Sequence, residues 1–164
     1  MKTIELTQGY VALVDDEDFE RVNAFKWYAQ VNHKTVYAHR STPRVNGKQG
    51  NQSLHRFLLN LPSGHDPEVD HKDRNGLNCQ RHNLRIATRQ QNCCNRNDKV
   101  KHKGISWSER CNKWKAHIQV NRKEVHIGYF SSQEAAAAAY DVAALKYYKE
   151  FALTNAMLAQ QESS

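Results

Sequence analysis

The chain has 164 residues with 39% hydrophobic and 9% aromatic content, which is enough for one ordinary domain or two small ones with packed cores. Its formal net charge of +7 favours a polyanionic partner. No apolar run approaches the roughly 20 residues of a membrane span, and the N-terminus lacks the apolar core of a signal peptide. We therefore expect a soluble, cytoplasmic protein with no membrane association.

The positive charge is concentrated between Arg96 and His126, where nine Lys and Arg residues stand against three Asp and Glu. Basicity alone does not separate nucleic acid from an anionic membrane as the partner, so the motifs must decide. The four cysteines include the adjacent pair Cys93 and Cys94, which cannot easily bridge to each other, and nothing indicates export. We expect no disulfides.

The N-terminal segment, residues 1–51, is predicted to be a β-rich scaffold. Short strands are expected around residues 4–6 and 10–14. A short helix follows and opens on the acidic run from Asp15 to Asp18, which we interpret as stabilisation of the helix dipole.

A hairpin and a helix are expected next. Residues 35–41 and 52–54 alternate like paired strands, and Asn46-Gly47 between them has the chemistry of a hairpin turn. The stretch 54–61 then predicts a short helix that Pro62 ends.

Residues 68–95 are polar and rich in His, Asn and Asp, which indicates a site rather than a core. Asp70 and His71 lie at the end of an expected strand, a second strand begins at Asn83, and a short helix contains Asn92. Two strands and a helix can bring a carboxylate, an imidazole and an amide to a common point. Oxygen ligands of this type suit Mg²⁺ or Mn²⁺.

This segment resembles the HNH homing endonucleases, especially the members that have Asn in place of the final His. The resemblance covers roughly residues 53–97, with Asn83 twelve positions beyond His71 and Asn92 nine further on. It implies a ββα-metal fold in which Asp70 and Asn92 hold one Mg²⁺ or Mn²⁺ ion. It also implies that His71 is the general base that activates water and that Asn83 orients its imidazole.

Neighbouring residues leave alternatives open. The pair His55-Arg56 also matches a common feature of these nucleases, and Arg56 could contact a phosphate or belong to the scaffold.

Zinc is not expected, because a structural site normally has two spaced ligand pairs rather than the adjacent Cys93 and Cys94, which we interpret as small buried residues. The residues considered as possible zinc ligands are Cys79, His82, Cys93 and Cys94. Three turn-forming residues are interpreted as loop builders: Asp73, Asn75 and Asn78.

Residues 98–102 are an expected basic linker to a second domain, residues 103–155. In its clearest strand, apolar residues from Trp114 to Val120 alternate with basic and polar ones, so one face is apolar. Two more strands are expected at 104–107 and 125–129. Their turn is expected at 121–123.

A helix is expected after these strands. Ser131 and Glu134 predict a capping box, and the five alanines that follow allow the helix to lie close on the sheet. Residues 156–164 are expected to be a loosely held tail.

This domain resembles the DNA-binding domain of plant ethylene-response factors and the APETALA family, which also occurs beside HNH nucleases in phage and bacterial genomes. The segments that carry the resemblance are HKGISW, KWKAHI, IGYFSSQEAAAAAYDVAALKY and FALTN. It implies that a three-stranded antiparallel sheet enters the major groove of double-stranded DNA. The candidate DNA contacts are Lys103, Ser106, Arg110, Lys113, Lys115, His117, Gln119, Arg122 and Lys123. The residues that depart from the plant pattern, so that its target sequence cannot be carried over, are Ser106, Gln119, Glu124 and His126.

The expected fold class is α+β: a ββα-metal unit, residues 52–97, behind the N-terminal scaffold, joined to a three-stranded sheet packed on one helix. The expected function is metal-dependent, site-directed DNA cleavage of homing or mobile-element type in a bacterial or phage-infected host cell. We expect a monomer or homodimer without a small-molecule substrate. The alternative is a non-cleaving, sequence-specific DNA-binding regulator on the same fold. RNA binding without catalysis would leave Asp70 and His71 unexplained.

Overall fold

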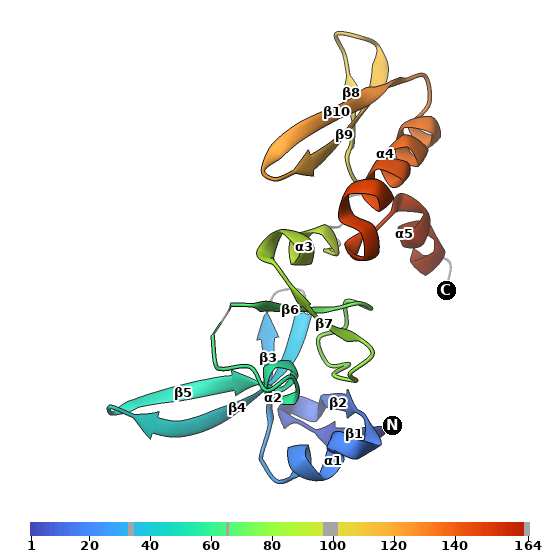
Figure 1. Ribbon diagram of the computed structural model, residues 1–164. Coiled ribbons are helices and arrows are strands. Elements are labelled where there is room, and N and C mark those ends of the chain that lie inside the picture. Colours follow the sequence, from blue (N-terminus) through green and yellow to red (C-terminus); the bar gives the residue numbers. More distant parts are fainter. Residues whose placement is uncertain (33–34, 65, 97–101, 163–164) are drawn as a thin grey trace. The chain divides into compact units, whose positions relative to one another are not determined.

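The computed structural model describes all residues except 33–34, 65, 97–101 and 163–164. The chain divides into two compact units, Met1–Arg89 and Gln90–Ser164. Both combine helices with small antiparallel sheets, which confirms the α+β class (Figure 1). The expected linker, residues 98–102, falls almost entirely outside the described residues. No helix in the described part of the chain is long and apolar enough to cross a bilayer.

The first unit contains three antiparallel sheets, β1-β2, β3-β4-β5 and β6-β7. Its strands are β1 (Lys2–Glu5), β2 (Val11–Val14), β3 (Tyr28–Asn32), β4 (Thr35–Val45), β5 (Lys48–Ser53), β6 (Glu68–His71) and β7 (Leu84–Ala87). Its helical elements are a 3₁₀ turn (Thr7–Gly9), α1 (Asp16–Asn23) and α2 (Leu54–Leu58). Strand β3 was not predicted, because its pairing with β4 and not its own short sequence defines it.

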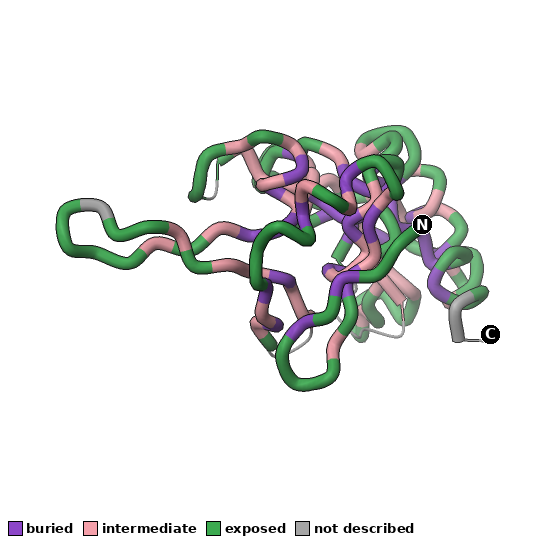
Figure 2. Tube along the Cα trace, turned by 90° about the horizontal axis from the view of Figure 1, so that it is seen from below, coloured by how far each residue is buried: buried purple, intermediate pink, exposed green. Residues whose placement is uncertain are grey.

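The β4–β5 hairpin is the most extended feature of the first unit. The predicted turn is confirmed, with positive φ at both Asn46 (50°) and Gly47 (75°), as a two-residue hairpin turn requires. The outer part of the hairpin projects away from the other strands of its unit (Figure 1) and is largely exposed (Figure 2).

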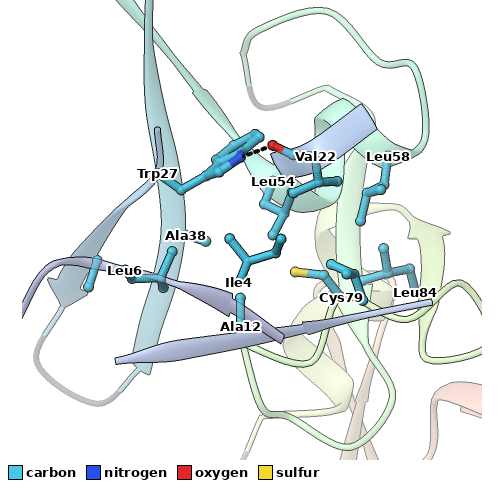
Figure 3. Close-up of a cluster of buried hydrophobic side chains, with 12 residues drawn as sticks. Ile4, Leu6, Ala12, Val22, Trp27, Ala38, Leu54, Leu58, Cys79 and Leu84 are labelled. Carbon is cyan, nitrogen blue, oxygen red and sulfur yellow. Dashed lines mark hydrogen bonds between the residues drawn. The ribbon is translucent and has the colours of Figure 1, made fainter. Parts of the chain in front are cut away.

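One hydrophobic core joins the N-terminal strands to the segment that carries the predicted site. Cys79 and Leu84 pack in the same cluster as Ile4 of β1 (Figure 3). The backbone of Leu13 in β2 bonds to the Leu77 carbonyl at 2.8 Å and to the Cys79 amide at 2.9 Å. The N-terminal segment is therefore part of the same folded body as residues 52–89 of the predicted nuclease segment.

The second unit is a sheet with helices. Its elements are most of α3 (Arg89–Cys94), then β8 (Ile105–Ser108), β9 (Lys113–Val120), β10 (Lys123–Phe130), α4 (Gln133–Tyr148), a 3₁₀ turn (Lys149–Phe151) and α5 (Asn155–Glu162). The strands form an antiparallel sheet in the order β10-β9-β8. Ile118 of β9 packs with Tyr140 and Ala144 of α4, which confirms the predicted sheet on a helix.

Two details of the helices differ from prediction. Ser132, and not Ser131, caps α4, because the Ser132 hydroxyl accepts from the Ala135 amide at 3.1 Å. Residues 156–162, which belong to the expected tail, form a held helix: the Asp141 carboxylate accepts from the amides of Asn155 (2.7 Å) and Ala156 (3.0 Å) at the start of α5. Leu158 of that helix is buried.

Candidate nuclease site and nucleic-acid surface

Asp70 and His71 are the last two residues of β6, as predicted, and each is 5% exposed. The β6–β7 register places Asp70 opposite Arg85. Both Nη2 (2.6 Å) and Nε (2.7 Å) of Arg85 contact the same carboxylate oxygen, Oδ2 of Asp70. A buried ion pair therefore holds the predicted metal-binding carboxylate. Arg85 was not among the predicted site residues, although its place opposite Asp70 in the expected strand pair could have indicated it.

The His71 imidazole lies in a cluster of three rings. His55 of α2 meets it edge-on, with ring centroids 5.2 Å apart and planes at 88°, and Tyr37 of β4 lies 5.8 Å away. Burial lowers the pKa of His71 to about 4, against the raising effect of the Asp73 and Asp70 carboxylates. The imidazole is therefore neutral near pH 7, which is the form that can accept a proton.

Asn83 holds the loop that follows His71. Its Oδ1 accepts from the Asp73 amide at 3.0 Å, and its Nδ2 donates to Asp73 Oδ1 at 2.9 Å and to the Asn78 carbonyl at 2.8 Å. These bonds use the oxygen and both hydrogens of the side chain. The prediction that Asn83 orients the His71 imidazole stays a prediction. Asn83 fixes the start of the loop.

The other polar residues of the loop build it, as predicted. Asp73 accepts from the Asn75 amide at 2.9 Å and from the Asn78 side chain at 2.7 Å. Asn75 Oδ1 in turn accepts from the Leu77 amide at 3.1 Å. Short polar side chains thus satisfy the backbone where no strand does.

The acidic residues at the start of α1 hold the far end of this loop. Asp15 accepts from the Gln80 side chain at 2.9 Å and from the Arg81 amide at 2.7 Å. The buried Asp18 pairs with Arg81 at 2.7 Å. Their interpretation as dipole-stabilising residues missed this role, because both partners lie more than 60 residues away in sequence.

Arg56 is a scaffold residue. It is 4% exposed, and its guanidinium donates to the carbonyls of Pro62 at 2.7 Å, of Asp66 at 3.2 Å, and of Pro67. The suggested phosphate contact is therefore wrong, because the donors are buried and bonded to the backbone.

The cysteines are packing or surface residues. Cys79 is 1% exposed in the core of the first unit, where burial raises the pKa of its thiol to about 12. Cys94 is buried as expected, but Cys93 is exposed. None of the four cysteines, which all lie among the described residues, forms a disulfide.

The β8–β10 sheet has one polar face, as the alternation in β9 predicts. Residues that pair directly in antiparallel strands share a face. The register places Ser106 beside Lys115, His117 beside His126, and Gln119 beside Glu124. Lys113 lies on the same side of β9. The predicted contacts outside this face are in exposed turns or at a strand end: Arg110, Arg122 and Lys123.

Two predicted contacts are engaged within the protein. The Lys103 ammonium donates to the carbonyls of Cys94 (2.9 Å) and Arg96 (2.8 Å), next to the end of α3. Lys103 therefore has a structural role, and its assignment as a DNA contact stays a prediction. Lys115 forms an ion pair of 2.7 Å with Glu124, so part of its charge is offset on the surface itself.

Comparison with known proteins bears on the Asp70-His71 site. No family model matches the chain. Over 154 residues it is 33% identical to an uncharacterized HNH endonuclease of Acanthamoeba polyphaga mimivirus, with 90% of this chain and 76% of the relative covered. The chain belongs to the HNH endonuclease family. A shorter similarity, 53% identity over 38 residues, covers 23% of this chain and 17% of an ethylene-responsive transcription factor-like protein of Arabidopsis thaliana.

The donor chemistry of the side chains in this family member can be compared with what the expected ion prefers. Asp70 offers a buried carboxylate, a hard oxygen ligand that fits Mg²⁺ or Mn²⁺. Among the side chains that the structure describes, no three His, Cys, Asp or Glu residues converge as a metal cluster. Asn92 lies in α3, in the second unit, and its assignment as a metal ligand rests on the sequence resemblance to HNH homing endonucleases.

Proposed function

We propose that the protein is a metal-dependent DNA endonuclease in which His71 is the general base. The observation that carries the proposal is a buried, neutral imidazole that directly follows a buried carboxylate at the end of β6. In the proposed reaction, His71 takes a proton from water, the water oxygen bonds to the scissile phosphorus, and an ester oxygen leaves. The homing or mobile-element type remains a prediction from sequence.

Asp70 is the proposed metal ligand, and the sequence resemblance to HNH homing endonucleases implies Asn92 as the second. When bound, a divalent ion would stabilise the negative charge that develops on the phosphate. Arg85 holds the Asp70 carboxylate from the neighbouring strand, so the ligand is positioned before the ion arrives.

Duplex DNA is the proposed partner of the β8–β10 sheet. Its polar face carries Lys, His and Gln side chains, and its turns carry exposed arginines, while its other face is buried on α4. A small sheet can enter the major groove, where base edges are distinguishable. The similarity to the plant transcription factor-like protein supports the same assignment.

The β4–β5 hairpin is a proposed second DNA contact, on the nuclease unit itself. From Thr35 to Ser53 the sequence contains no Asp or Glu, whereas Arg44 and Lys48 are exposed near its turn. Arg40 near its base is held by a bond to Gln52 at 2.8 Å. A two-stranded ribbon of this kind is narrow enough for the major groove, and its charge complements phosphate.

The decisive test is incubation of the protein with supercoiled plasmid and Mg²⁺, Mn²⁺ or EDTA. We expect metal-dependent nicking or linearisation. His71→Ala should lower the rate by about 10² to 10⁴-fold with DNA affinity retained. Asp70→Ala should lose cleavage, with partial rescue by higher Mn²⁺.

His82→Ala, a change at an exposed histidine of the same loop, is the matched control and should cut normally. A protein that binds DNA tightly but cuts with neither metal would overturn the proposal in favour of the regulator. Cleavage by His71→Ala at the wild-type rate would remove the general-base assignment.

A further inference from the structure

We propose that His55 is a positioning residue that fixes the orientation of the His71 imidazole; this inference rests on the proposed role of His71 as general base. A histidine ring turns about its terminal side-chain bond with little preference. A general base must nevertheless be held close to its productive angle. Something in the structure must therefore restrict that rotation, and the Asn83 side chain bonds to Asp73 and Asn78 of the loop.

The ring of His55 is placed to restrict it. Its edge-on contact with His71, at 5.2 Å and 88°, is the nearest ring contact in the cluster. The ring centroid of Tyr37 lies 5.8 Å from that of each of the two imidazoles, so Tyr37 is the second ring that packs against His71. A ring bounded in this way cannot turn without moving one of its neighbours.

His55 is itself held in place. Its Nε2 lies 3.0 Å from the hydroxyl of Ser53, which precedes α2. Ser53 makes no side-chain cap bond to the helix, so its hydroxyl serves the imidazole instead. Burial foremost, and then His71, His39 and Arg56, keep the pKa of His55 well below its ordinary value. The two rings therefore meet as neutral groups.

The loop supports the cluster from behind. A Cβ atom at Gly76 would fall 2.6 Å from the Tyr37 ring and 2.5 Å from the Val36 carbonyl, so the loop backbone packs directly against Tyr37. Asn83 and Asp73 fix that loop. Asn83 thus reaches His71 through the loop and Tyr37, whereas His55 touches its ring.

The test is single-turnover cleavage by the full chain with Mg²⁺, as a function of DNA concentration. We expect His55→Ala to lower the maximal rate by about tenfold or more with unchanged half-saturating DNA, and His55→Phe, which keeps a ring, to recover part of the loss. Phe57→Leu is the matched control on α2: its ring packs against Phe25 and Trp27, and the change should reduce stability but not the rate.

A double-mutant cycle separates positioning from general damage. In a His71→Ala background, His55→Ala should have no further effect on the residual rate, since its action passes through His71. The inference would be overturned if His55→Ala lowered the cleavage rate equally in both backgrounds, or if His55→Ala alone cut at the wild-type rate. Neither result would affect the proposed function, because the wild type would still cut DNA.

The mobility of the His71 ring can be measured independently of DNA cleavage. NMR relaxation of the His71 ring should report a rigid ring in the wild type and a mobile ring in His55→Ala. Equal mobility of the His71 ring in the wild type and in His55→Ala would overturn the inference, whether or not the wild type cuts DNA. Failure of the wild type to cut DNA would separately refute the proposed function. If His55→Ala does not fold, Ser53→Ala provides the same comparison, with a smaller increase in ring mobility expected.

Discussion

Lowering the pH from about 7.5 to about 4.5 should destabilise the first unit through His71. Burial holds the pKa of the folded imidazole at about 4, against 6.5 for the exposed group. Above pH 6.5 the ring is neutral in both states and its contribution does not change. Between pH 6.5 and 4 the unfolded chain binds a proton that the folded chain does not, so stability falls as the pH falls. The shift corresponds to about 3 kcal/mol, of which about 2.5 should be lost by pH 4.5.

The assay is urea denaturation in EDTA, followed by the fluorescence of Trp27 in a background of Trp107→Phe and Trp114→Phe. Trp27 is then the single tryptophan and reports on the first unit. His71→Gln should remove the part of the pH dependence that is due to His71, about 2.5 kcal/mol by pH 4.5. The parts due to His55 and His39, whose pKa values are also lowered by burial, should remain. His82→Gln, at an exposed position, should keep the whole pH dependence. Equal pH slopes for the wild type and His71→Gln would refute the argument.

Three further outcomes are expected. Gly104→Ala should lower the free energy of unfolding of the second unit by about 2 kcal/mol or more, because φ is 67° and a Cβ would fall 2.1 Å from the Tyr140 ring. Thermal melting should show a much smaller loss of stability for Gly128→Ala, because a Cβ there would lie 3.2 Å from its nearest neighbour. Arg85→Ala should lose about 3 kcal/mol because it removes the 2.6 Å ion pair with the buried Asp70 carboxylate, and Mn²⁺ should restore part of that loss. No Mn²⁺ effect on the melting temperature would contradict the proposed ligand. The logarithm of the DNA-binding constant should fall with the logarithm of salt concentration at a slope of about −3 or steeper if three or more cationic side chains of the sheet and its turns reach phosphates. A slope near zero would exclude this surface as an electrostatic DNA-binding surface.

Patterns that repeat locally were predictable. Alternation identified the two faces of β9, and Asn46-Gly47 identified the hairpin turn, because the backbone geometry of each depends on adjacent residues. The place of Asp70 and His71 at the end of β6 also followed from the short strand before them.

Contacts between distant segments were not predictable. The three-ring cluster takes Tyr37 from β4, His55 from α2 and His71 from β6, and nothing in any one of these segments identifies the other two. For the same reason Arg56, which is charged and would be expected at the surface, was not recognised as the buried donor to three carbonyls.

The pairing of Leu13 with both sides of the loop at Leu77 and Cys79 bears on how such a protein could be recombined. A gene fusion that transferred only residues 52–97 would leave the loop without β2 and without the Asp15 carboxylate. A crossover inside Met1–Arg89 would separate the two halves of one fold, and the proposed ligand Asn92 extends the exchangeable piece through α3. Among natural or engineered chimaeras, active ones should have their junction after Cys94.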